Sequence, residues 1–195
     1  KIDIDNVKKV LVNEQSMLII KNDKTLWALG TGGNGQQGDG ETTNNKVPTQ
    51  VKSPDGKGFL ENVKDVGTSW YGFFALTEDN KLYAWGNNAQ GQLGLGDTTN
   101  RNLPTEVKDK DGNNLGSKVA SLQQTPGNHS VILVMKDGSL YGSGQTSNKL
   151  FGTANGNNKT TFESIFEQYL QFEDIRPYIK VGETEKLKVT IGEGF

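Results

Sequence analysis

The segment "LYAWGNNAQGQLGLGDTTNRNLPTEV", residues 82–107, decides the fold of this protein. It opens as an aromatic strand, passes through a glycine-rich loop, and ends in a second extended stretch that contains a proline. Glycine permits the positive φ angles and close backbone approaches that sharp turns between strands require. The segment shows no arrangement typical of a nucleophile, a metal cluster or an acid–base pair. We therefore interpret it as a structural unit, and such a unit is expected to recur.

A gap-free copy lies upstream, at residues 26–51, which read "LWALGTGGNGQQGDGETTNNKVPTQV". Its Gly30 falls on Gly86, an offset of 56 residues, and the other glycines that the two copies share keep the same offset. A more divergent third copy follows at an offset of 58, where Gly144 corresponds to Gly86 and Phe162 replaces the proline. Self-similarity at a fixed period indicates an array of supersecondary units.

Each copy contains a predicted antiparallel hairpin. In the second copy the apolar run "GFFAL", residues 72–76, leads through a polar turn into "LYAWG", residues 82–86. Further strands are predicted at residues 63–66 and near residues 104–107, which makes four per copy. Four short strands in about 56 residues match one blade of a β-propeller. Because consecutive apolar residues in a strand need cover on both faces, stacked blades suit this pattern.

We therefore predict an all-β protein that forms a partial β-propeller, an open arc of about three four-stranded blades. The blades are predicted at residues 1–56, 57–112 and 113–165, followed by a linker and strand at residues 166–195. Two interpretations of this tail stay open. Its segment "YIKVGETEKLKVTI", residues 178–191, aligns with the start of a blade, which favours a truncated fourth blade. The same stretch is similar to the first strands of bacterial immunoglobulin-like surface domains.

The composition excludes several classes of partner and site. The 195 residues include no cysteine, which rules out disulfides and cysteine-ligated zinc. A formal net charge of −2 provides no general basic field, so we predict no nucleic-acid partner. No apolar run approaches the ~20 residues that a membrane-spanning helix needs, so no membrane span is predicted.

Residues 63–107 closely resemble the repeat of the regulator of chromosome condensation family. The aromatic "YAWG" strand, the N-x-x-G-Q-L-G loop and the downstream P-x-x-V all stand at the expected spacing. The resemblance extends from residue 1 to about residue 165 and implies a seven-bladed propeller in the complete family architecture. Three copies cannot close such a ring. We therefore expect a fragment of a longer array, an assembly of several chains, or an open arc with apolar end faces that self-associates.

Motifs that would indicate a catalytic, cofactor-binding or metal-binding site are weak throughout the sequence. The run "GTGGNGQQGDG" has glycine spacing that suggests phosphate binding, but no Lys-Ser or Lys-Thr follows and a strand comes next. The turn "DKDGNN", residues 109–114, places Gly112 too early for a calcium loop, so a solvated turn is favoured. A single histidine, His129, does not define a catalytic set. The sequence therefore predicts no enzyme activity, no cofactor and no metal.

Four residues are the candidates for contact with a partner. Trp70 and Tyr71 lie at a strand end, where a propeller presents its rim, although burial in the blade is an equal alternative for each. Arg101 in the loop of the second copy is suited to an acidic partner, with a solvated side chain as the default interpretation. His129 occupies the His-Ser position that the family resemblance implies, for which packing or hydrogen bonding within the fold is the alternative.

The leading functional hypothesis is a non-catalytic protein- or ligand-binding module within a larger bacterial protein. The abundance of lysine, asparagine and glycine, the lack of cysteine and the tail favour a secreted or cell-surface location, with a cytoplasmic one left open. The alternative, which only the family resemblance implies, is guanine-nucleotide exchange on a small GTPase. That activity in the family depends on a loop outside the common repeat, and no insertion in this sequence stands out as one.

Overall fold

The structure, a computed structural model, describes residues 4–125, 127–146, 151, 157–165, 170–172 and 189–191. In this part of the chain three four-stranded antiparallel sheets follow one another in sequence, each with its strands in consecutive order. The first sheet contains β1 (Val7–Val12), β2 (Ser16–Lys21), β3 (Leu26–Gly30) and β4 (Asn45–Gln50). The second contains β5 (Val63–Ser69), β6 (Gly72–Thr77), β7 (Leu82–Gly86) and β8 (Arg101–Glu106). The third contains β9 (Val119–Leu122), β10 (Ser130–Met135), β11 (Leu140–Gly144) and β12 (Lys159–Ser164), and is preceded by a short 3-10 helix, η1 (Gly116–Lys118).

The predicted hairpins are confirmed. The strands β6 and β7 pair antiparallel from Gly72 opposite Gly86 to Leu76 opposite Leu82. The edge strands extend slightly beyond the predicted limits, because β5 continues to Ser69 and β8 begins at Arg101. The strands of each sheet lie within the residue ranges predicted for the three repeats.

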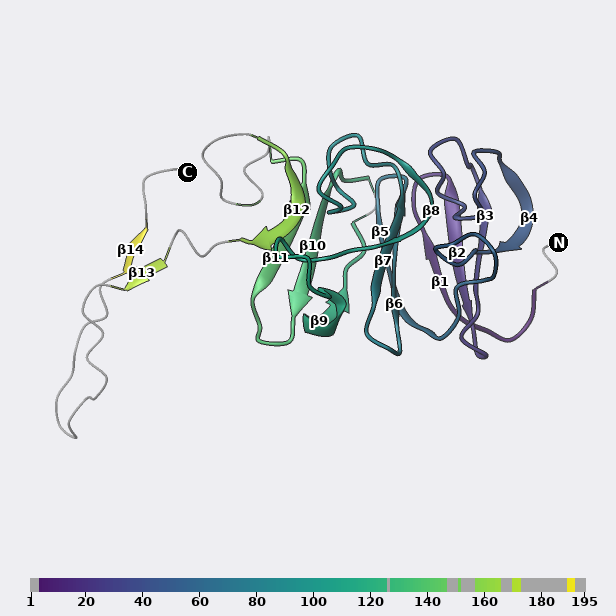
Figure 1. Cartoon of the computed structure of the whole chain (residues 1–195), viewed down its shortest axis with the longest axis horizontal. Coiled ribbons are helices and arrows are strands. Elements are labelled where there is room, and N and C mark those ends of the chain that lie inside the picture. Colours follow the sequence, from purple (N-terminus) through teal and green to yellow (C-terminus); the bar gives the residue numbers. More distant parts are fainter. Residues whose placement is uncertain are drawn as a thin grey trace.

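The three sheets stack face to face in sequence order without closing into a ring (Figure 1). Every residue of β6 is buried, which requires apolar cover on both faces of the second sheet. One apolar core fills the space between the first and second sheets, and a second core fills the space between the second and third. Burying a large apolar side chain contributes roughly 1.5–3 kcal/mol, so these two cores hold the arc together. The prediction of a partial β-propeller with an open arc is confirmed.

The repeated glycines serve the same backbone role in successive sheets. Gly30, Gly86 and Gly144 each end the third strand of a sheet, with φ angles of 113°, 100° and 99°. A Cβ atom on Gly86 would overlap the carbonyl oxygen of Tyr71. Both the dihedral angle and the close approach therefore require glycine at this position.

The tail is described only in part. The strand β13 (Leu170–Phe172) pairs antiparallel with β14 (Val189–Ile191). Residues 173–188, including most of the segment aligned with a blade, lie outside the described residues. The choice between a fourth blade and an immunoglobulin-like domain therefore stays a prediction. Within the described chain, no helix has the length and apolar character needed to cross a membrane.

Candidate functional site

Three of the four residues predicted to contact a partner lie together at the end of the second and third sheets. Trp70 and Tyr71 form the tight turn between β5 and β6, and their ring centroids are 4.6 Å apart. The ring of His129, which directly precedes β10, stands edge-on to Trp70 at a centroid distance of 4.2 Å. All three side chains are half-buried. We refer to Trp70, Tyr71 and His129 as the rim cluster.

Backbone hydrogen bonds between the two sheets fix the rim cluster in place. The amide of Trp70 donates to the carbonyl of Asn128 at 2.9 Å. Just before the turn, the carbonyl of Thr68 accepts from both the amide and the hydroxyl of Thr125, at 3.0 and 2.9 Å. The turn itself uses a φ angle of 52° at Tyr71, in the left-handed region that non-glycine residues rarely adopt. The orientation of the cluster is therefore set by the fold before any partner binds.

The imidazole of His129 is held in its neutral form. Burial lowers the pKa of His129 below the ordinary value, because the charged ring would lose hydration. Its Nδ1 atom is buried and has no hydrogen-bond partner among the described residues. At neutral pH the rim cluster therefore presents an uncharged aromatic surface.

Arg101 lies apart from the rim cluster, at the start of the edge strand β8. Its guanidinium donates to the Oδ2 atom of Asp97 and to the carbonyl of Thr99, each at 2.6 Å. The hydrogen bond from Arg101 is the largest cause of the lowered pKa of Asp97. Because both contacts stay within one loop, Arg101 orders the chain entering β8. Its predicted contact with an acidic partner stays a prediction.

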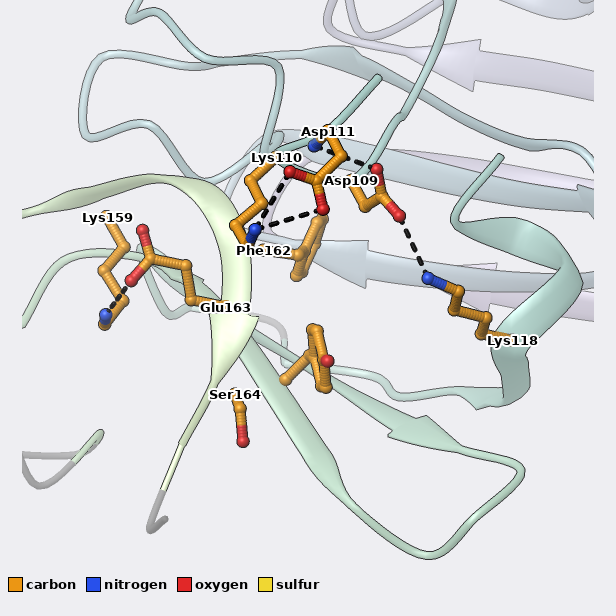
Figure 2. Close-up of a pocket in the computed structure, with 9 residues that line it drawn as sticks. Asp109, Lys110, Asp111, Lys118, Lys159, Phe162, Glu163 and Ser164 are labelled. Atoms are coloured by element: carbon orange, nitrogen blue, oxygen red, sulfur yellow. Dashed lines mark hydrogen bonds and ion pairs between the residues drawn. The ribbon is translucent and has the colours of Figure 1, made fainter. Parts of the chain in front are cut away.

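A hollow between the second and third sheets was not singled out from the sequence. It has a volume of about 380 Å³, and its walls carry paired charges around two aromatic side chains (Figure 2). We refer to it as the charged hollow, lined by Asp109, Lys110, Asp111, Lys118, Tyr141, Lys159, Phe162, Glu163 and Ser164.

Three ion pairs surround the charged hollow. Lys118 donates to the Oδ2 atom of Asp109 at 2.9 Å, and Lys110 donates to both oxygens of Asp111 at 2.9 and 3.0 Å. Lys159 pairs with Glu163, which lies four residues further along the same strand. The turn at residues 109–114 gave a sequence signal only for a solvated loop. Lys159 comes close to this turn only when the chain folds, so the spacing of residues along the sequence could not reveal the site.

The carboxylate of Asp109 is the most strongly perturbed of the acidic groups in the hollow. Its pKa falls to about 2, chiefly through the hydrogen bond from Lys118 and a backbone hydrogen bond from Asn113. The backbone amide of Asp111 donates to it as well, at 3.0 Å. Asp109 therefore holds the turn and Lys118 together at all ordinary pH values. In the described part of the chain no group of three or more histidine and acidic side chains is placed to hold a metal ion.

Comparison with protein families identifies the repeat. The family described as the regulator of chromosome condensation (RCC1) repeat matches residues 79–133, and a second model of the same repeat matches residues 63–92. RCC1 repeats are therefore detected in residues 63–133, which confirms the resemblance seen in the motifs of this segment.

Curated relatives match this chain over part of much longer sequences. The ultraviolet-B receptor UVR8 of Arabidopsis thaliana is 33% identical over 91 residues, which cover 47% of this chain and 20% of the relative. The guanine nucleotide exchange factor SRM1 of Saccharomyces cerevisiae is 28% identical over 141 residues, which cover 72% of this chain and 28% of the relative. The chain thus spans between a fifth and a third of the length of these two proteins.

Solved structures agree on the fold. Human WBSCR16 matches with a TM-score of 0.67 at 24% identity, over 85% of this chain and 39% of that one. Yeast RCC1 (Prp20), solved bound to Kap60, matches with a TM-score of 0.64 at 20% identity, over 89% and 40%. At these identities the likeness establishes the propeller architecture of the three stacked sheets.

Proposed function

We propose that this chain is a non-catalytic protein-binding module of a larger protein, and that the rim cluster contacts the partner. The observation that carries the proposal is the half-exposed Trp70, flanked by Tyr71 and His129 and fixed by inter-sheet hydrogen bonds. Tryptophan and tyrosine are enriched among residues that dominate binding energy. A surface that is ordered in advance also loses less entropy when a partner binds.

We also propose that each of the three sheets is one RCC1 repeat. The family matches cover residues 63–133, which is the second sheet and the beginning of the third. Support for the first sheet comes from the gap-free sequence copy and from the shared strand register, in which Gly30 opposes Ser16 as Gly86 opposes Gly72. The sequence offset of 58 supports the third.

We propose a bacterial, secreted or cell-surface parent protein. The proposal rests on the lack of cysteine and on the similarity of the tail to immunoglobulin-like surface domains. Immunoblotting of culture medium, surface-shaved material and cell lysate tests it. Recovery of the parent protein only from the lysate, after protease treatment of intact cells, would contradict it.

We also propose that the chain self-associates through the apolar end faces of the arc. A protein that presents an uncovered apolar sheet face tends to bury it against another surface.

Affinity capture followed by titration tests the role of the rim cluster. The chain is used as bait, captured proteins are identified by mass spectrometry, and the affinity of each is measured by calorimetry. Trp70→Ala is expected to weaken specific binding at least tenfold, because it removes the centre of the cluster. Phe59→Ala, which truncates a 52% exposed aromatic side chain in the loop after β4, serves as the matched control. Equal losses in the two variants would contradict the proposal.

Guanine-nucleotide exchange on a small GTPase is the alternative, and the relative SRM1 is described as such an exchange factor. Release of a fluorescent guanine nucleotide from a panel of small GTPases distinguishes the two functions. We expect the release rate to be unchanged by stoichiometric amounts of the chain. Acceleration of at least tenfold on one GTPase would favour the alternative.

A further inference from the structure

Each sheet has two different apolar faces, one for each neighbouring sheet. In the second sheet Val66 and Trp85 belong to the core shared with the first sheet, whereas Phe74 and Leu82 belong to the core shared with the third. We call the face that carries Val66 and Trp85 the backward face, and the face that carries Phe74 and Leu82 the forward face. The second sheet thus contacts its two neighbours through different surfaces.

The forward face of the third sheet is uncovered. One pair of forward-face residues recurs at equivalent positions of the three sheets: Ile20 opposite Leu26, Leu76 opposite Leu82, and Val134 opposite Leu140. The pairs of the first and second sheets are buried in the two cores, so both junctions join a forward face to the backward face of the next sheet. Val134 and Leu140 are only half-buried, and no further four-stranded sheet of the described chain follows them.

The first sheet has the opposite face uncovered. Val10, Ile19 and Trp27 lie opposite one another in the strand register, so they form one row of the backward face. Trp27 is half-buried, whereas its counterpart Tyr83 is buried in the first core. The first and third sheets lie at opposite ends of the stack (Figure 1). The arc therefore ends in the two complementary halves of a junction.

The outer edges of the sheets repeat the same connection. The amide of Gly40 donates to the carbonyl of Asn102 at 2.9 Å. One repeat further along, the amide of Gly96 donates to the carbonyl of Thr160 at 2.8 Å. A loop of each repeat is thus hydrogen-bonded to the fourth strand of the next repeat, and the two junctions are built alike.

The fourth strand of the first sheet has the form of a strand that receives such a loop. In the second sheet Leu103 packs beside Gly40, with its Cδ2 atom 3.6 Å from the place where a Cβ on that glycine would stand. The counterpart of Leu103 in the first sheet is Val47, which is 68% exposed on β4. Its apolar side chain has no loop of a preceding repeat to cover it within the described chain.

We propose that copies of this chain join head to tail, with the forward face of the third sheet of one copy on the backward face of the first sheet of the next. This geometry rests on the proposed self-association and names the face used on each side. A second copy fits because the chain carries both halves of a junction that it already forms twice. Such a contact leaves one free face at each end, so rings or longer assemblies form, whereas pairing of two first sheets stops at a dimer.

Pairs of variants that each have one damaged face test the geometry. Val10→Lys damages the backward face and Val134→Lys the forward face, because a buried ammonium group loses its hydration. In sedimentation velocity each variant alone is expected to associate at least tenfold more weakly than the unmodified chain. An equimolar mixture is expected to form a complex with one copy of each, because each variant supplies the face that the other lacks. Val10→Lys mixed with Val47→Lys, two variants with the same face damaged, is the control and should stay monomeric.

The outcomes separate the geometry from self-association itself. Undiminished association of Val134→Lys, with loss in Val10→Lys, would mean that two first sheets pair, which overturns the head-to-tail contact and leaves self-association standing. A Val10→Lys and Val134→Lys mixture without a complex would also overturn it. An unmodified chain that stays monomeric would refute both proposals. Far-ultraviolet circular dichroism checks that each variant is folded, and Ile132→Lys on the same forward face replaces Val134→Lys if that variant unfolds.

Discussion

At the scale of single residues, the backbone angle and the space around a glycine decide whether a side chain is tolerated. Gly86 combines a φ angle of 100° with a position where a Cβ would meet the backbone of Tyr71 and Gly72. Gly138 has a φ angle of 85° but no atom within 4 Å of its Cβ position. Comparing alanine substitutions at the two sites therefore separates the free-energy cost of dihedral strain from that of a steric overlap.

Gly86→Ala is therefore expected to be the more damaging substitution. Strain alone at Gly138→Ala should lower the free energy of unfolding by about 1 kcal/mol. The added overlap at Gly86→Ala should bring the loss to about 3 kcal/mol or prevent folding. Urea denaturation followed by tryptophan fluorescence measures both. Equal losses would show that the close approach to Tyr71 is not maintained in solution.

The carboxylate of Asp109 gives a residue-scale prediction about pH. Its pKa is lowered from 3.8 to about 2 by the hydrogen bonds from Lys118 and the turn. A group whose folded pKa is depressed stabilises the fold above its unfolded pKa, and that contribution is lost as pH falls from about 4 to 2. In Asp109→Asn the stability should fall less steeply over this interval. Urea midpoints at pH 5, 4, 3 and 2 measure the slopes, and identical slopes for the two proteins would refute the assignment.

At the scale of strands and sheets, the junction between the first two sheets rests on Trp85. The side chain is fully buried, and its Nε1 atom donates to the carbonyl of Gln36 at 3.0 Å. Trp85→Ala should cost about 3–5 kcal/mol, because it leaves a cavity and a carbonyl without its donor. The corresponding residue of the first sheet, Leu29, is half-buried, and Leu29→Ala should cost about 1 kcal/mol. Thermal unfolding monitored by far-ultraviolet circular dichroism measures the difference.

The contacts within each sheet were predictable from the sequence. Alternation of apolar runs with polar turns defined the hairpins, and the recurring glycines fixed the copies in register. The contact from Trp85 to Gln36 was not predictable, because it joins two repeats through a backbone carbonyl that carries no sequence signal. The charged hollow was missed for a related reason. It depends on residues 159–164 lying against the turn at residues 109–111 once the second and third sheets stack, and local spacing does not reveal that contact.

The rim cluster was predicted only in part. Exposed aromatic residues next to a predicted strand pointed to Trp70 and Tyr71, and the family resemblance pointed to His129. The contact between Trp70 and His129 follows from the stacking of the second sheet on the third, which the repeat pattern implies without giving distances. Arg101 was also chosen as a loop residue, but its guanidinium is used within that loop, because Asp97 lies four residues earlier in the chain and accepts its hydrogen bond.

At the scale of the whole molecule, the first sheet ends the arc with an apolar face. Val10 is 45% exposed, whereas its counterpart Val66 in the second sheet is 1% exposed. Val7 and Val63 differ in the same way, at 41% and 0%. The side chains of this face thus have the character of an inter-sheet core, but no sheet of the described chain covers them. Burial of such a face against another copy would recover the apolar free energy that the inner junctions already gain.

We therefore expect the chain to associate through the face of the first sheet. Sedimentation velocity between about 5 and 200 μM should show a rising weight-average mass, and Val10→Lys should shift the protein toward monomer without loss of secondary structure. Phe59→Lys introduces the same charge at a 52% exposed position in the loop after β4 and should leave association unchanged. Because Val10 and Phe59 are both exposed, neither variant disturbs a core. A stable monomer at 200 μM that binds no apolar dye would mean that this face is already covered within one chain.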